Sequence, residues 1–558
     1  MEALKEYTPL QENRKEEERR EERVGGGAEG GGKGGAEGGE KENSRKVAQV
    51  AVVVGESRGA RPEEGSSAPL HVSSPTSQGT ADMTLGASCS RAPARMHTRL
   101  LKILGGMPLE PMLFLKMVAE GNYGVVADTL EQDRICRVNL NFSQEECDGW
   151  IHDANLSYVK VAVQHRQNLF NYNQSIMDSV LPLAVVLFAG SLSDRHGRKP
   201  PMLAVLAGFV VLAATYLVEA LNPGWPVQVM YAGTLVVDMM GSWVVFNMAV
   251  YSYVADISTP ETRTRRLAIL DAVWYLGGPL GRLLGGWLYR LAGFAVVFAV
   301  SCALWLVCFL YTLLLVRETV DRAAPKPEVE QDLGDARWGP LRHVVALCRT
   351  TFKARPSHGR LYLLVIVVLK MAVFLVQGHL MYQWAQNVLR WGAAEYSTWS
   401  SVDSVVHQVG MVAWTWVAAR AGLHDALVAA GGVVSIGLWS AILASITQPD
   451  LWWMAAVATV AGMLEPCMEP ALRTLLTTEV GEGEAGRVLA LMGLVEAAWF
   501  LADRSIYTFL YNAFFTVFPQ INLVVQAGLC VPLLLAMLLL WRALRNRAAS
   551  TYDLPHQE

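Results

Sequence analysis

The sequence predicts an all-α membrane protein in which about twelve transmembrane helices form two bundles of six. Three observations support this fold class. Of the 558 residues, 52% are hydrophobic and only 18% are charged. The hydrophobic residues gather in runs of about 20, which is the length of helix that crosses the hydrocarbon layer of a bilayer. A charged, proline-containing stretch near the middle of the chain separates the two sets of runs.

Residues 1–97 form a tail that we expect to be disordered and cytoplasmic. It contains the low-complexity run VGGGAEGGGKGGAEGGEKENSRK and then a Ser/Pro-rich stretch, with too few large apolar residues to offset the entropy lost on ordering. No apolar core follows the initial Met, so we do not expect a signal peptide. Tyr7–Leu10 (YTPL) matches a tyrosine-based sorting signal that would bind sorting adaptors, although so short a pattern also arises by chance.

The hydrophobic runs define the order of the spans. In the N-terminal bundle, residues 98–318, we expect helices at 108–128, 171–191, 200–221, 228–253, 267–289 and 293–316. A cytoplasmic linker, 319–357, follows. In the C-terminal bundle, residues 358–545, we expect helices at 360–384, 397–419, 425–446, 452–474, 487–513 and 522–542, followed by a cytoplasmic tail, 546–558.

The basic residues predict the orientation of these spans. The clusters DRHGRK (194–199), TRTRR (262–266) and WRALRNR (541–547) fall on one side together with the linker, and that side is cytoplasmic by the positive-inside rule. Both termini then lie in the cytoplasm. The loop 129–170 faces the opposite side.

The loop 129–170 carries features of a non-cytoplasmic segment. It contains glycosylation sequons at Asn141 and Asn155, which accept glycans only on that side. Cys136 and Cys147 lie in the same loop, where an oxidising space would allow a disulfide. They can pair with each other, or one of them can pair with another loop or stay free.

The loop GSLSDRHGRKP, which joins the second and third spans, combines flexible and charged residues at a defined spacing. Gly190 allows helices to approach closely and Gly197 permits a tight turn. Asp194 and Arg198 can form a charged latch, which makes this loop a candidate cytoplasmic gate. A simple basic hairpin is the alternative. A second charged stretch, VADISTPETRTRR, follows the fourth span.

Both stretches resemble the signature loops of the major facilitator superfamily. Together with LEPMLFL in the first span, the fourth-span aspartate and EPALRTLLTTEVGEGEAG in the tenth, they resemble the proton-coupled folate transporter family, solute carrier family 46, over roughly residues 108–545. The resemblance implies a carrier that imports an organic anion (a folate, cyclic dinucleotide or muropeptide) with protons as the coupling ion and no other cofactor. It also implies a multi-pass protein of the plasma membrane, endosome or lysosome.

Ionisable residues inside a span are functional candidates, because a charge at the centre of the bilayer costs ~2.5–3.5 kcal/mol or more. The candidates are Lys116, Glu120, Asp238, Asp271, Arg282, Lys370, Asp403, His407, Glu465, Glu469, Arg473, Glu496, Asp503 and Arg504. A spacing of four residues places Lys116 with Glu120, Asp403 with His407, and Glu469 with Arg473 on shared helix faces. Glu465 extends the last face by one turn. Self-neutralised pairs that only tune packing are the alternative, and the fifth-span run GGPLGRLLGG fits close helix packing.

The family resemblance selects a subset of these charges. It implies a role in substrate or proton handling for Arg473, a fourth-span aspartate at Asp238, and a proton-coupling carboxylate at Asp271 in place of a glutamate. One departure is Ala372, which stands where the folate carrier has a histidine, with Lys370 and His379 nearby. The expected substrate and proton-coupling set is Arg473, Glu469, Glu465, Asp271, Asp238, Asp403 and His407.

The sequence also excludes several classes of function. It shows no nucleophile–base spacing, no zinc ligand set and no nucleotide-binding loop, so we expect neither an enzyme nor an ATP-driven pump. The expected partners are the lipid bilayer and a small anionic solute, not a nucleic acid polymer. An uncoupled uniporter or exchanger, and a transporter-like receptor or scaffold that signals through its tail, remain as alternatives.

The topology predicts that Asn141 and Asn155 carry glycans. Glycosidase treatment of the full chain should lower its apparent mass, and the Asn141→Gln/Asn155→Gln double variant should show no such change. A change that persists in the double variant would assign the glycan to the sequon at Asn173 and would move the second span.

Overall fold

The computed structural model describes residues 108–319 and 359–552 apart from 378–379 and 481–484, together with a few residues between 345 and 353. Every regular element in the described residues is a helix. In the N-terminal half these are α3 (Glu110–Arg134), η1 (Ile135–Asn139), α4 (Gln144–Gly149), η2 (Ala154–Leu156), α5 (Ser157–His196), α6 (Lys199–Leu221), η3 (Val227–Val229), α7 (Met230–Met239), α8 (Ser242–Ile257) and α9 (Pro260–Leu315).

The C-terminal half is built in the same way. Its elements are α11 (Gly359–Phe374), α12 (Met381–Val388), α13 (Ala393–Ala421), α14 (Asp425–Ala444), η5 (Pro449–Leu451), α15 (Trp453–Ala461), η6 (Glu465–Cys467), α16 (Met468–Thr478), α17 (Ala485–Phe514) and α18 (Ile521–Tyr552). The sorting pattern at Tyr7–Leu10, the rest of the tail 1–97 and most of the linker lie outside the described residues.

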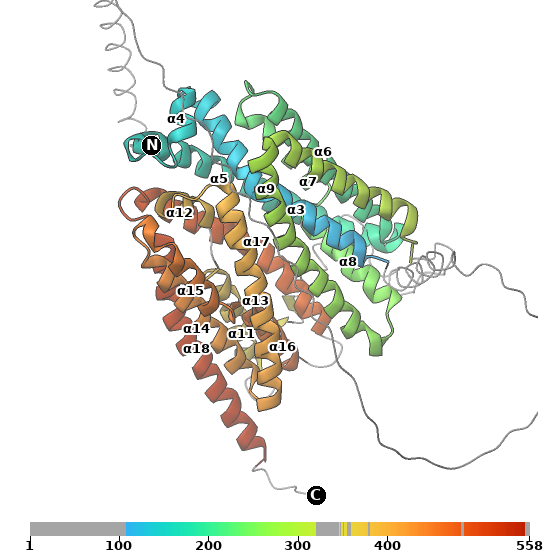
Figure 1. Cartoon of the computed structure of the whole chain (residues 1–558). Coiled ribbons are helices and arrows are strands. Elements are labelled where there is room, and N and C mark those ends of the chain that lie inside the picture. The colour runs from blue at the N-terminus through green and yellow to red at the C-terminus, as the bar shows by residue number, and fades with distance from the viewer. Residues whose placement is uncertain are drawn as a thin grey trace, which may run out of the picture. The chain divides into compact units, whose positions relative to one another are not determined.

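The helices form two bundles, as the sequence predicted. The blue-to-green helices of the first half and the yellow-to-red helices of the second lie on opposite sides of Figure 1. Each half has a large hydrophobic core of its own, one built from residues between Leu109 and Val316 and the other from residues between Leu363 and Leu540. The predicted all-α fold with two bundles is therefore confirmed.

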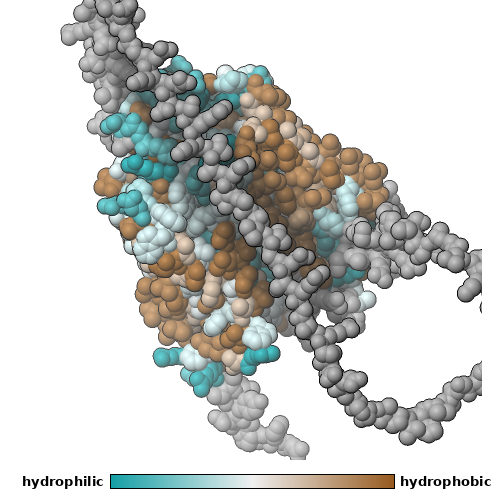
Figure 2. Space-filling view, in the orientation of Figure 1, coloured by the Kyte–Doolittle hydropathy of each residue, from teal (hydrophilic) through white to brown (hydrophobic). Residues whose placement is uncertain are grey.

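The outer surface of the bundles is suited to lipid. Figure 2 shows hydrophobic residues over the flanks of both bundles and hydrophilic residues gathered toward their ends. Large apolar side chains are exposed in both bundles, such as Leu291 and Phe509. Six helical segments of the described chain are long and apolar enough to cross a membrane by length and composition. Helices α3 and α17, which carry several charged residues, are not among these six.

Several predicted spans differ from the structure. The fourth, seventh and tenth are each divided, between α7 and α8, between α11 and α12, and between α15 and α16. Helix α5 begins at Ser157, well before the predicted start of the second span at residue 171, because its first turns cover polar residues outside the apolar run. The predicted fifth and sixth spans both fall within α9, which is interrupted at Gly293 by a left-handed φ of 77° that glycine adopts without strain. Helix α18 continues to Tyr552, into the predicted C-terminal tail.

The loop after α3 is ordered by a disulfide and a helix cap. Cys136 of η1 is bonded to Cys147 of α4, which settles the pairing that the sequence left open. Ser143 and Glu146 form a reciprocal capping box at the start of α4. The sequon residues Asn141 and Asn155 are both exposed.

A glycine-rich contact between α3 and α9 positions the polar residues of the interior. A Cβ added to Gly281 would lie 2.2 Å from the backbone oxygen of Val118, and one added to Gly285 would lie 2.3 Å from that of Asn122. The two backbones can therefore approach this closely only because glycine lacks a side chain. Asn122 Nδ2 secures the contact by donating to the backbone oxygen of Val297, at 2.9 Å, and to Ser301 Oγ, at 2.8 Å.

Two glycines on α9 make a matched test of this contact. Gly281→Ala should destabilise the protein by about 1–3 kcal/mol, because the added carbon meets backbone that cannot move aside. Gly278→Ala should leave stability unchanged or slightly raised, because nothing lies within 4 Å of its added carbon and alanine favours the helix by about 0.5–1 kcal/mol. Thermal unfolding of the purified chain in detergent measures both, and equal midpoints would contradict the close contact.

Candidate functional site

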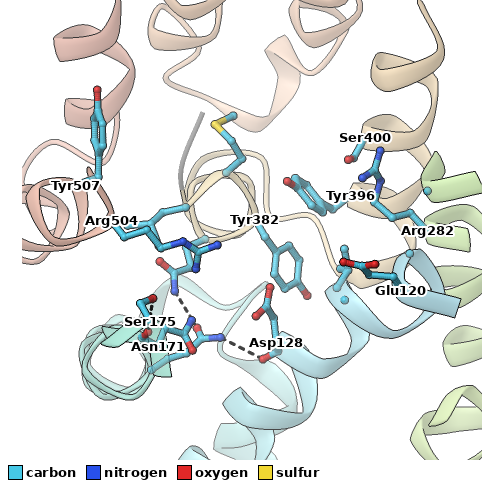
Figure 3. Close-up of a pocket in the computed structure, with 18 of the residues that line it drawn as sticks. Glu120, Asp128, Asn171, Ser175, Arg282, Tyr382, Tyr396, Ser400, Arg504 and Tyr507 are labelled. Carbon is cyan, nitrogen blue, oxygen red and sulfur yellow. Dashed lines mark hydrogen bonds between the residues drawn. The ribbon is translucent and has the colours of Figure 1, made fainter. Parts of the chain in front are cut away.

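A cavity of about 500 Å³ lies between the two bundles. It is lined by α3, α5 and α9 of the first bundle and by α12, α13 and α17 of the second. Figure 3 labels Glu120, Asp128, Asn171, Ser175, Arg282, Tyr382, Tyr396, Ser400, Arg504 and Tyr507 around it. Its volume is that of a typical small-molecule site, and its lining mixes aromatic rings with a few polar groups.

Two arginines, one from each bundle, face this cavity. Arg282 of α9 donates a hydrogen bond across the bundle interface to the hydroxyl of Ser404 on α13. Arg504 of α17 stacks over the ring of Phe500, with its guanidinium carbon 4.8 Å from the ring centre. Among the described residues, neither guanidinium forms an ion pair with a carboxylate. Figure 3 shows the two arginines on either side of Tyr382.

The carboxylates of the cavity do not balance these two cations. Glu120 is paired with Lys116, whose side chain is fully buried and lies 4.9 Å from the ring centre of Trp274. Asp128 remains, and it is attracted to Arg504. Two guanidinium groups therefore face one carboxylate that has no lysine partner, which leaves the cavity with a net positive charge suited to an anion.

A layer of buried carboxamides closes one end of the cavity, on the side of the disulfide loop. Gln132 of α3 and Gln386 of α12 exchange two hydrogen bonds, at 2.9 and 2.7 Å. Further bonds across the interface join Gln383 to Gln167 (3.0 Å), Asn387 to Gln164 (2.8 Å) and Asn168 to Asn512 (2.5 Å). We call these eight residues the carboxamide layer. Because the disulfide loop is the predicted outer loop, the layer closes the predicted outer side.

The candidate gate lies at the opposite end of the first bundle. Arg198 Nε is 3.0 Å from Asp256 of α8, so the two charged loops are joined. The carboxylate of Glu318 accepts from the backbone N–H groups of Arg198 (2.8 Å) and Lys199 (3.1 Å) at the start of α6. Gly197 has a φ of +108°, and a Cβ there would lie 2.2 Å from the Glu318 carboxyl group.

The latch partner in the described structure is therefore Asp256, a residue that the sequence reasoning did not single out. The side chain of Asp194, the predicted partner of Arg198, lies outside the described residues. Gly190 makes only an ordinary contact, with its added Cβ 3.8 Å from Met248 Sδ. Its predicted role in close helix approach is not apparent in this contact.

The predicted pair of Glu469 and Arg473 is present, and it belongs to a larger network. Arg473 Nη2 is 3.1 Å from Glu469 Oε1. Lys370 of α11, which is only 1% exposed, is 2.5 Å from Glu469 and 2.6 Å from Glu496 of α17. Glu469 is thus shared between two cations, so loss of Arg473 as a partner would still leave it paired with Lys370.

Glu465 does not extend this network as its spacing predicted. The proline-containing segment η6 interrupts the helix, and Glu465 instead lies 4.0 Å from His407. His407 is 3.6 Å from Asp403, which accepts from the hydroxyl of Thr459 at 2.7 Å. Asp403, His407 and Glu465 therefore form a second cluster, and they line a smaller cavity of about 250 Å³.

The remaining two candidates lie apart from both clusters. Asp238 of α7 is fully buried, and neither of its carboxyl oxygens accepts a hydrogen bond from a described residue. Its neighbouring charged group is the carboxyl of Asp178 on α5. Asp271 accepts from the hydroxyl of Tyr251 at 2.8 Å.

None of the seven predicted residues lines the larger cavity. Arg282 and Arg504 were among the ionisable residues of the predicted spans, but no helical spacing or family counterpart selected them. The carboxamide layer was missed because its side chains are neutral. A detectable pattern exists, since Gln164, Gln167 and Asn168 repeat the spacing of Gln383, Gln386 and Asn387. His379 lies outside the described residues.

A family model described as the Major Facilitator Superfamily matches residues 174–502. The chain belongs to this superfamily. Among solved structures, the human organic anion transporter MFSD10 (TETRAN) covers 77% of this chain and 97% of its own, with a TM-score of 0.54 and 15% identity. A peptide transporter POT in complex with sulfate covers 78% and 94%, with a TM-score of 0.53 and 11% identity. These two structures support the fold.

The relatives found by sequence include members of solute carrier family 46, as the motifs indicated. The proton-coupled folate transporter of Rattus norvegicus is 25% identical over 76% of this chain and 89% of its own length. The lysosomal proton-coupled steroid conjugate and bile acid symporter SLC46A3 of Gallus gallus is 22% identical over 76% and 91%. The "Probable peptidoglycan muropeptide transporter SLC46" of Drosophila melanogaster is 23% identical over 76% and 84%. The chain is a multi-pass membrane transporter related to proton-coupled symporters, and not an enzyme.

Because Lys370 contacts two carboxylates and Arg473 only one of them, we expect the loss of Lys370 to destabilise the protein more than the loss of Arg473. Lys370→Met leaves the carboxylates of Glu469 and Glu496 without their buried cation and should destabilise the protein by about 3–5 kcal/mol. Arg473→Gln should cost about 0–1 kcal/mol, because Arg473 is 54% exposed and Glu469 keeps Lys370. Lys370→Met/Glu496→Gln should recover part of the loss. Thermal unfolding measures all three, and a smaller effect for Lys370→Met than for Arg473→Gln would contradict the shared network.

Proposed function

We propose that the protein is a secondary active transporter that imports an organic anion by proton symport with alternating access, and that the larger cavity holds the substrate. The observation that carries the proposal is the pair of arginines, Arg282 and Arg504, that face this cavity from opposite bundles without ion-pair partners among the described residues. A guanidinium group binds carboxylate or phosphate through two parallel hydrogen bonds, so each arginine offers a site for an anionic group.

The position of these arginines suits alternating access. A substrate that binds both would join the two bundles at the centre of the membrane, where rocking of one bundle against the other exchanges access between the two sides. The carboxamide layer keeps the predicted outer side closed in this structure, since its hydrogen bonds join α3 and α5 to α12 and α17. Import begins in the other conformation, in which these bonds are broken.

The proton site that we favour is Asp238. A buried carboxylate without a hydrogen-bond donor is costly in its charged form, and the neighbouring carboxyl of Asp178 adds repulsion. Binding one proton between the two would remove both costs. The cluster of Asp403, His407 and Glu465 is the alternative site. We retain Asp271 and the Glu469–Arg473 pair as further candidates for proton coupling.

The names of the relatives suggest classes of substrate and a membrane location, which we give as proposals. Their names include a folate carrier, a muropeptide transporter and a lysosomal symporter of steroid conjugates and bile acids. We propose a folate-like, cyclic dinucleotide or muropeptide substrate, and a location in the plasma membrane or the endosomal and lysosomal membranes. Both termini would be cytoplasmic, with Tyr7–Leu10 available to sorting adaptors and glycans on Asn141 and Asn155.

Uptake into proteoliposomes tests the proposal. With a panel of labelled folates, cyclic dinucleotides and muropeptides, an inward proton gradient should drive accumulation. Arg282→Gln and Arg504→Gln should each reduce uptake by about tenfold or more at every pH, because a charged hydrogen bond contributes about 1.5–3 kcal/mol. Asp238→Asn should leave substrate binding in place and abolish the response to the proton gradient. Arg290→Gln is the matched control, since this α9 arginine is exposed and pairs with Glu395 away from the cavity.

Other outcomes favour the other functions. If the uptake rate of the unaltered protein is the same with and without a proton gradient, the protein is a uniporter or exchanger. A receptor or scaffold would accumulate none of these solutes. Its signalling output would be lost when residues 1–97 are removed. Normal uptake by both arginine variants would place the substrate site elsewhere.

A further inference from the structure

A smaller cavity of about 250 Å³ opens beside the central one. The two cavities share Met381, Tyr396 and Ser400 in their linings, so they adjoin one another. The volume lies below the range of about 300–1,000 Å³ that is usual for a whole ligand, which makes it suited to one part of a larger molecule. It is enclosed by helices α12, α13 and α14 and the segment η6, all from the C-terminal bundle.

The lining of this side cavity has the chemistry of a cation site. Tyr396, Trp399 and Trp439 contribute aromatic rings, whose faces attract an ammonium group. Asp403 and Glu465 contribute two carboxyl groups, and the described lining contains no lysine or arginine. The lining therefore favours a positive charge, in contrast to the central cavity.

The acidic groups are held in place rather than neutralised by cations. Asp403 Oδ1 accepts from the hydroxyl of Thr459 at 2.7 Å and from the indole N–H of Trp439 at 3.3 Å. His407 also lines the cavity and is only 8% exposed, and its Nε2 has no hydrogen-bond partner among the described residues. That nitrogen lies 3.6 Å from Asp403 Oδ1, so the imidazole borders the same carboxylate.

A cation of the central cavity interacts with the side cavity. Arg282 lines the central cavity, donates to Ser404 on the same helix as Asp403, and is attracted by the Asp403 carboxylate. A positive and a negative binding region therefore adjoin one another along α13. One molecule that carried both kinds of charge would match both regions at once.

We infer that the side cavity is a subsite for an organic ammonium group, so the substrate is a zwitterion whose anionic group binds Arg282 while its ammonium group lies between Asp403, Glu465 and the three aromatic rings. This inference rests on the proposed transport of an organic anion and specifies the substrate further. It favours peptide-like or amino-acid-like anions over anions that carry no amine.

Charged thiol reagents test the inference without a known substrate. Gln377 lines the side cavity alone, and Thr508 lines the central cavity alone, so cysteine at each position reports on one region. The purified full chain, as Gln377→Cys or as Thr508→Cys, is treated with 2-aminoethyl and 2-sulfonatoethyl methanethiosulfonate. Each rate is divided by the rate with free 2-mercaptoethanol, and the reaction of the parent chain, which has its own free cysteines, is subtracted.

At Gln377→Cys the ammonium reagent should react about tenfold faster than the sulfonate, as expected for two nearby carboxylates. Adding Asp403→Asn or Glu465→Gln should reduce this preference to threefold or less, and two separate variants guard against failure of one to fold. Adding Asp450→Asn, in the loop before α15, is the matched control and should change nothing. Equal rates at Gln377→Cys, or a preference that both acid variants leave unchanged, would overturn the inference.

Thr508→Cys separates this inference from the proposed function. It should prefer the sulfonate reagent, because Arg282 and Arg504 face the same cavity. If Thr508→Cys prefers the sulfonate while Gln377→Cys shows no preference, the anion site stands and only the ammonium subsite fails. If Thr508→Cys shows no preference for the anion, the proposed anion site itself fails.

Discussion

A charge in the hydrocarbon layer needs a partner, and this constraint explains where the charged residues of the two bundles lie. Lys116 is paired with Glu120, and Lys370 with both Glu469 and Glu496. Each of these contacts faces the interior, because lipid offers no groups that could replace it. Three other charged groups are more informative. Arg282 and Arg504 line the central cavity without an ion pair in the described structure, and Asp238 is buried without a hydrogen bond there. A transporter can use such groups because a solute or a proton completes them.

The close contact of α3 and α9 gives this arrangement its geometry. Gly281 and Gly285 bring the two backbones together, and the same stretch of α9 carries Arg282 between them. Arg282 directly follows Gly281, where the backbones of α3 and α9 are in close contact, and it lines the cavity from this packed pair of helices. Tight packing and the position of one proposed substrate-binding residue, Arg282, thus depend on the same short run of sequence.

Much of the fold was predictable from sequence, while the site was predictable only in part. Hydrophobic runs located the spans, because helix length in a bilayer has a narrow range. The spacing of four residues correctly paired Lys116 with Glu120 and Glu469 with Arg473, because both pairs lie on uninterrupted helix. It failed for Glu465, where η6 breaks the periodicity and turns the carboxyl toward His407. No local rule could pair Lys370 with Glu469, because the two residues meet only after α11 and α16 have packed together.

The carboxamide layer has a consequence for the energetics of the transport cycle. Its side chains are amides, which do not ionise at any physiological pH, and their separation moves no formal charge through the electric field of the membrane. When a hydrogen bond between two of these side-chain amides breaks, each group forms a hydrogen bond to water instead. The net contribution of one such hydrogen bond to the closed conformation is therefore only about 0.5–1.5 kcal/mol. The closing force is thus weak, reversible and indifferent to voltage and acidity. Any dependence of the transport cycle on membrane potential must therefore arise from the charged residues of the interior and from the substrate. The hydrogen bonds of the carboxamide layer break and form in the same way at neutral and at acidic pH.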